Sequence, residues 1–258
     1  MNARPPAWRH VAAGIASALL AAAALAQTPT LSAFSAATGD AAPPPWRVVG
    51  LPGAKAPLAR ITLVPLDGVR VARLATDASY GTLVHDIAPW TPQASATLSW
   101  RWRLDQPLAA ADLRRKEGDD AALKLCVMFD LPLDALPFGE RTLMRVARTV
   151  SGEKLPAAAL CYVWDASLPT GTVLPNAYSR RVRFMAVDGT ASAPGQWRSH
   201  QRSLAADFLK VFGDDTQQVP PAVAVVIGAD ADNTAGRSLG YIDDVTITPL
   251  SPWPGCCN

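Results

Sequence analysis

The stretch ATLSWRWRLD, residues 96–105, constrains the fold most strongly. Its large apolar residues fall at every second position: Leu98, Trp100, Trp102 and Leu104. The residues between them are mostly polar or charged. Because successive side chains of a strand point to opposite faces, this spacing predicts a strand with one face against a core. We expect Trp100 and Trp102 to lie in that core.

Short segments of similar character recur along the chain, separated by turn-forming residues. The predicted strands are 46–50, 60–65, 69–75, 81–86, 95–104, 122–130, 159–164, 181–187, 197–203, 222–229 and 240–248. Many short strands with a turn roughly every ten residues predict an antiparallel β-sandwich. The fold class is therefore mainly all-β.

Two segments have helical spacing instead. LPFGERTLMRVARTVSG ends at Gly152, and SLAADFLKVFG begins with Ser203, a favourable N-cap, and ends at Gly213. Neither belongs to a repeated β-α-β alternation, which disfavours a parallel doubly wound sheet. We expect two short helices within one sandwich domain, residues 46–250.

The first 26 residues have the features of a signal peptide. Arg4 and Arg9 precede an apolar run from Val11 to Leu25, and Ala24-Leu25-Ala26 is a small-x-small cleavage sequence. The run is shorter than the roughly 20 residues of a membrane span. We therefore expect cleavage, a periplasmic or secreted protein, and no membrane span after cleavage. Residues 27–45 are rich in Ala, Ser, Thr and Pro and predict a flexible leader.

Cleavage also changes the charge. The chain has 24 Lys and Arg against 22 Asp and Glu, and loss of Arg4 and Arg9 leaves 22 against 22. A neutral protein lacks the basic surplus of a nucleic-acid binder, so we expect no nucleic-acid partner.

Four cysteines could form disulfides in an oxidising compartment. Cys126 and Cys161 lie in separate predicted strands, where a disulfide competes with two buried free thiols. Cys256 and Cys257 lie in a Pro- and Gly-containing tail, residues 251–258. Their pairing stays open.

The order of motifs resembles a known family. LSWRWRLDQPL, KEGDDAALKLCVMFD, LCYVWD, WRSHQRSLAADFLKVFG and VVIGADADNTAGRSLGYIDDV follow one another across residues 98–245. This succession resembles DUF3047, a bacterial exported family of unknown function. The resemblance implies a jelly-roll-like β-sandwich similar to carbohydrate-binding modules, and it implies no activity.

Acidic residues gather at two predicted strand ends. The candidate metal ligands are Asp119, Asp120, Asp230, Asp232 and Asn233. Oxygen donors at alternating positions suit Ca²⁺, although the spacing fails the EF-hand pattern. The alternative, which we favour, is that these side chains cap their own turns. A structural Ca²⁺ is thus a secondary expectation, and no other cofactor is predicted.

Alternation also predicts a cationic face opposite the core. The candidate ligand-binding residues are Arg101, Arg103, Lys124, Arg181, Arg183 and His200, with Trp164 as an aromatic platform at a strand end. Neighbouring arginines could bind the carboxylates or sulfates of an acidic glycan. An ordinary solvated face, balanced by nearby aspartates, is the alternative that we favour. Trp90, in a predicted loop, is a second platform candidate.

Catalytic motifs are scarce. The sequence lacks G-x-S-x-G, P-loop and H-E-x-x-H patterns. A lyase acting on acidic glycans could use Arg101 and Arg103 with His200 or Tyr162 as base. We favour a non-catalytic binder of a glycan or cell-envelope component. A lyase-type enzyme and a purely structural envelope protein are the alternatives.

Overall fold

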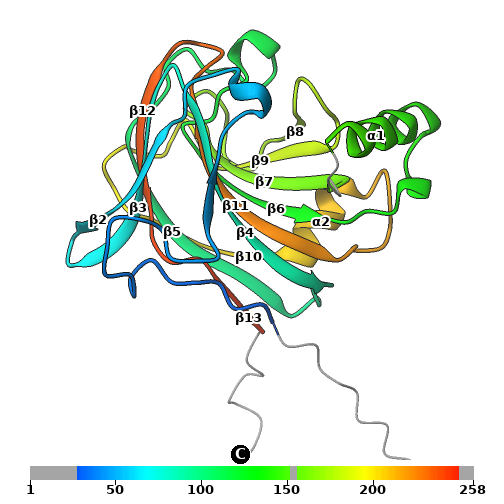
Figure 1. The fold of residues 1–258 in the computed structure, drawn as a ribbon, viewed down its shortest axis with the longest axis horizontal. Helices are drawn as coiled ribbons and strands as arrows, with labels where there is room; N and C mark the ends of the chain where they lie inside the picture. Colours follow the sequence, from blue (N-terminus) through cyan, green and yellow to red (C-terminus); the bar gives the residue numbers. More distant parts are fainter. Residues whose placement is uncertain (1–27, 152–155, 250–258) are drawn as a thin grey trace, which may run out of the picture.

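The computed structural model describes residues 28–151 and 156–249 of the 258. The predicted signal peptide and the tail with Cys256 and Cys257 lie outside them. Two β-sheets make up most of the fold (Figure 1). Seven strands form the larger sheet, in the order β1 (Arg47–Val49), β4 (Tyr80–Trp90), β11 (Ala222–Asp230), β6 (Leu123–Phe129), β7 (Ala158–Trp164), β9 (Val182–Asp188) and β8 (Val173–Pro175).

The smaller sheet has six strands. Its order is β10 (Arg198–Ser203), β5 (Ala96–Gln106), β12 (Arg237–Ile242), β3 (Val69–Asp77) and β2 (Arg60–Leu66), and β13 (Thr246–Pro249) also pairs with β5. All pairings between named strands are antiparallel except that of β7 with β9, which is parallel. The mainly β, two-sheet antiparallel sandwich predicted from the sequence is confirmed.

Both predicted α-helices are present, as α1 (Phe138–Ser151) and α2 (Leu204–Phe212). Three short 3-10 turns lie at Pro52–Ala54, Lys116–Gly118 and Leu133–Ala135. Ser203 caps α2 by accepting a hydrogen bond from the backbone N–H of Ala206. Neither α-helix in the described ranges has the length and apolar character needed to cross a bilayer.

The main core lies between the two sheets. Trp100 and Trp102 of β5 are buried there, as predicted, and Trp102 packs against Trp164 of β7. Helix α2 adds Phe208 and Phe212 to the same core. The alternation of β5 thus places its large apolar side chains in the most dehydrated part of the molecule.

Residues 28–45 correct the prediction of a flexible leader with little to bury. Phe34 is completely buried and its ring contacts that of Trp46 at 5.2 Å between centroids. The Phe34 backbone N–H donates to Asp244 Oδ1, and that of Ser32 donates to His85 Nε2. Two apolar anchors, Leu31 and Phe34, therefore hold this segment on the sandwich.

Two strands also differ from the prediction. The expected strand 240–248 is interrupted between β12 and β13, where Asp243 bonds to Arg101 and Asp244 bonds to residues 34 and 35. The short strand β8 was not predicted, because its three residues offer no periodicity to detect.

Candidate functional site

The seven-stranded sheet carries a hollow on the face that points away from the six-stranded sheet. Its volume is about 650 Å³. The lining residues come from strands β4, β6, β7, β9 and β11 and from the loops at one end of the sheet: Leu51, Lys55, Tyr80, Thr82, Leu113, Asp119, Ala121, Lys124, Cys126, Met128, Ala159, Cys161, Asn176, Tyr178, Val182, Phe184, Val226, Asp230, Asp232 and Asn233.

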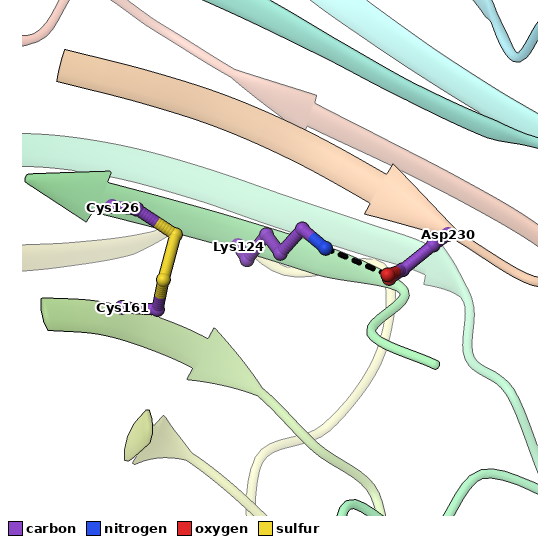
Figure 2. Close-up of a disulfide and its surroundings, with 4 residues drawn as sticks. All are labelled: Lys124, Cys126, Cys161 and Asp230. Carbon is purple, nitrogen blue, oxygen red and sulfur yellow. Dashed lines mark hydrogen bonds and ion pairs between the residues drawn. A yellow bond between two sulfur atoms is a disulfide. The ribbon is translucent and has the colours of Figure 1, made fainter. Parts of the chain in front are cut away.

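The floor of the hollow is apolar and is cross-linked. Cys126 of β6 lies directly opposite Cys161 of β7 in the strand register, and the two form a disulfide (Figure 2). This confirms one of the two alternatives for these cysteines. Phe184 and Val226 pack with the disulfide in a second buried cluster. The outer face of this sheet is therefore apolar too, in contrast to an ordinary solvated face.

A buried ion pair lies beside the disulfide. Lys124 Nζ is 2.7 Å from Asp230 Oδ2 (Figure 2) and 5.1 Å from the centre of the Tyr80 ring. Burial lowers the pKa of Lys124, but Asp230 and Tyr80 outweigh it, so the net pKa lies above its usual value and the amine stays charged. Gly228 leaves room for this side chain, since a Cβ there would lie 3.0 Å from Lys124 Cε.

Asp119 lies in the wall of the hollow with unused bonding capacity. Its Oδ2 accepts one hydrogen bond, 2.5 Å from Asn176 Nδ2, and its buried Oδ1 has no partner among the described residues. Burial raises the pKa of Asp119 to about 6, and the bond from Asn176 opposes this only in part. A poorly solvated carboxylate in a hollow can accept hydrogen bonds from a ligand.

Asp120 stabilises the turn after β11. Its carboxylate is fully buried and accepts hydrogen bonds from the backbone N–H groups of Asn233 and Thr234, at 3.1 and 2.7 Å. The turn-capping alternative is thus the one that the contacts support, although the capping carboxylate comes from the loop before β6.

The same contacts bear on the predicted metal ligands. Asp230 pairs with Lys124 and also accepts a bond from the backbone N–H of Ala121. Asp232 lines the hollow and makes no ion pair in the described part of the chain. Within residues 28–151 and 156–249, no three His, Cys, Asp or Glu side chains are grouped to hold a metal ion. Of the five predicted ligands, Asp120 and Asp230 thus have carboxylates that are held by backbone or lysine donors.

Tyr178 forms an aromatic rim. Its side chain is 60 % exposed, yet its hydroxyl is fixed, because it accepts from Asn233 Nδ2 at 2.9 Å and donates to the Lys116 carbonyl at 3.2 Å. The neighbouring Asn176 accepts from the backbone N–H groups of residues 178 and 179, which holds the loop. Lys116 Nζ lies over one face of this ring, 5.4 Å from its centre, so the opposite face is the one that can stack on a flat apolar face of a ligand.

The predicted cationic face does not form. Arg101 and Arg103 project from the six-stranded sheet, where Arg101 pairs with Asp243 and Arg103 with Asp105. Lys124 instead lies in the hollow of the other sheet. Of the two aspartates expected to balance a solvated face, Asp105 and Asp130, Asp105 pairs with Arg103, whereas Asp130 pairs with Arg148 of α1. The shared cationic surface is absent from the described residues.

Arg181 and Arg183 lie on yet another side. Arg183 contacts the Phe212 ring at 4.4 Å and pairs with Asp214 and Asp215 after α2. Arg181 pairs with Asp215 and with Glu140 of α1. The predicted parity of β9 is wrong, because Phe184 faces the disulfide while Met185 faces the main core.

The other predicted ligand contacts are buried. Trp164 is 2 % exposed in the main core and cannot serve as a platform, and Trp90 at the end of β4 is buried as well. His200 lies 2.7 Å from Asp188 Oδ2 and packs on Trp100. Tyr162 is fully buried and donates to Asp207 Oδ2 at 2.9 Å. Of the residues proposed for lyase chemistry, Arg101 and His200 both line a second hollow of about 360 Å³ on the six-stranded sheet, whereas Tyr162 lies in the core and Arg103 does not line that hollow.

Sequence reasoning missed Asn176, Tyr178 and Tyr80. The signal for the first two was the Pro-Asn turn within VLPNAYSR, which marks a loop but not its contacts. Tyr80 begins β4 and shows no pattern that separates it from core residues.

The fold and the hollow define a class, that of β-sandwich proteins with a ligand-sized depression on one sheet. Residues 44–246 match the family described as "Protein of unknown function (DUF3047)", so the chain belongs to this family. No curated protein matches it.

Several solved structures match most of this chain at low identity. The xyloglucanase domain of NopAA from Sinorhizobium fredii is 11% identical with a TM-score of 0.45, over 79% of this chain and 92% of that one. The family 11 carbohydrate-binding module from Clostridium thermocellum is 8% identical with a TM-score of 0.38, over 83% and 91%. An exo-beta-agarase is 12% identical with a TM-score of 0.43, over 86% of this chain. The matched region spans 25% of the agarase chain.

Proposed function

We propose that the protein binds a glycan, without chemically altering it, in the hollow of the seven-stranded sheet. The observation that carries the proposal is the exposed but fixed ring of Tyr178 at the rim of a hollow with polar walls. A pyranose has an apolar face and a ring of hydroxyls, and it needs both an aromatic surface and hydrogen-bond acceptors.

The dimensions and chemistry of the hollow support this ligand class. A volume of about 650 Å³ falls within the range of roughly 300–1,000 Å³ typical of small-molecule sites. Asp119 and Asp232 supply acceptors on the wall, Asn176 supplies an amide, and the disulfide with Phe184 supplies the apolar floor.

A glycan array tests the proposal directly. The protein with its disulfide intact should bind a restricted set of oligosaccharides, and the Tyr178→Ala variant should lose those signals. The proposal fails if the folded wild-type protein binds no oligosaccharide, or if loss of the ring leaves every signal unchanged.

Export is part of the proposal. The disulfide between Cys126 and Cys161 supports an oxidising compartment. N-terminal sequencing of the protein from the periplasm or medium should begin at Gln27. A cytoplasmic protein that retains the first 26 residues would contradict export.

A further inference from the structure

The charges of the hollow point to the kind of glycan that fits it. Three carboxylates line the hollow, those of Asp119, Asp230 and Asp232, against the amines of Lys55 and Lys124. Lys124 is held by Asp230 at 2.7 Å, and Lys55 is an exposed residue of the loop after β1. The wall is therefore acidic where Asp119 and Asp232 lie.

These two carboxylates also have few donors. Asp119 accepts one bond from Asn176, and its Oδ1 has no partner among the described residues. Asp232 makes no ion pair within those residues and is only half-buried. An acceptor withdrawn from water without a donor is unfavourable, and a ligand that supplies a donor relieves that cost.

We propose that the hollow selects oligosaccharides that carry a protonated amine, such as de-N-acetylated hexosamines, and disfavours acidic ones. The inference rests on the proposed glycan-binding function and names its ligand class. An ammonium group supplies three donors and a positive charge to Asp119 and Asp232, whereas a uronate carboxylate meets like charge there. This reverses the acidic-glycan preference expected from the arginines.

Calorimetry on the folded wild-type protein is the first test. The probes are glucosamine oligomers, their N-acetylated counterparts and galacturonate oligomers of equal length, at neutral pH and low salt. The glucosamine oligomers should bind about tenfold or more tightly than the N-acetylated ones, since charge-assisted hydrogen bonds exceed neutral ones. Added salt should weaken binding of the glucosamine oligomers and leave binding of the neutral N-acetylated oligomers unchanged.

Single aspartate variants test whether the carboxylates of the hollow cause the preference for amine-bearing oligosaccharides. Asp119→Asn and Asp232→Asn should each reduce the preference for the amine, while Asp86→Asn removes an equally charged but exposed residue outside the hollow and should not. If Asp119→Asn does not fold, Asp232→Asn alone tests whether the hollow prefers the amine.

The outcomes separate the two proposals. Equal or stronger binding of the N-acetylated or acidic oligomers would overturn the amine preference and leave glycan binding intact. An Asp86→Asn effect equal to that of the two hollow variants would also overturn it, because it would show attraction to net charge alone. Failure of the whole glycan array would remove the glycan-binding function itself.

Discussion

Lys124 Nζ of β6 lies 2.7 Å from Asp230 Oδ2 of β11, and both side chains are 11 % exposed. Removing one partner of a buried pair leaves the other charge without compensation. Lys124→Met should therefore cost about 3–5 kcal/mol in the free energy of unfolding, measured by urea denaturation. The double variant Lys124→Met with Asp230→Asn should recover part of that loss. Strictly additive losses would show that the pair does not couple.

Asp188 connects the two sheets. It accepts bonds from Trp102 Nε1 at 2.6 Å, His200 Nε2 at 2.7 Å and Ser192 Oγ at 2.8 Å. Asp188→Ala leaves these buried donors unpaired and should cost about 3 kcal/mol or more in the free energy of unfolding. Asp86→Ala, which breaks an exposed pair with Arg47, should cost about 0–1 kcal/mol. Equal costs for the two variants would contradict this role of Asp188.

Asp188 also predicts that the protein loses folding stability at acid pH. Burial raises the pKa of Asp188, but the bonds from His200, Trp102 and Ser192 outweigh it and leave the pKa below its ordinary value. A lowered pKa stabilises the folded state above the unfolded pKa, and that stabilisation is lost as pH falls further. Wild type should thus approach the stability of Asp188→Ala in unfolding curves collected below about pH 4. A difference that persists unchanged at acid pH would contradict this.

Asp119 predicts that the stability of the folded state changes with pH in the opposite direction. Its pKa is raised to about 6 by burial, so ionisation destabilises the folded state as pH rises through that value. Asp119→Asn keeps an acceptor for Asn176 and cannot ionise. The variant should melt at a higher temperature than wild type near pH 8, and the two should converge below about pH 4. A variant less stable than wild type at pH 8 would refute the assignment.

The disulfide predicts a stability loss on reduction. It closes a 35-residue separation that includes α1. Replacing Cys126 and Cys161 by alanine should cost about 2–4 kcal/mol in the free energy of unfolding. Dithiothreitol should lower the melting temperature of wild type to about that of the alanine variant. The melting temperature of the variant itself should not respond to dithiothreitol. Wild-type melting that does not respond to full reduction would contradict a structural disulfide.

Much of the fold follows from local pattern. The alternation of β5 predicted its buried tryptophans, and the caps of α2 predicted its limits. The position of Asp119, Asp230 and Asp232 at one end of the sheet also follows from their places at strand ends. The prediction of a shared cationic face was wrong, because Arg101 and Arg103 lie on the other sheet and both faces of the seven-stranded sheet are apolar near β9. The pattern Arg-Val-Arg-Phe-Met-Ala therefore does not show which of its two faces meets the main core.

Tyr178 provides the most direct test of glycan binding. With the tightest oligosaccharide from the array, Tyr178→Ala should raise Kd by about tenfold, as expected when an aromatic contact is removed from a binding site. Tyr178→Phe keeps the ring but removes the hydroxyl bonds to Asn233 and Lys116 that hold it, so its Kd should lie between those of wild type and Tyr178→Ala. Phe138→Ala removes an 82 % exposed ring that does not line the hollow and should have no effect. An unchanged Kd for Tyr178→Ala in a correctly folded protein would contradict the account.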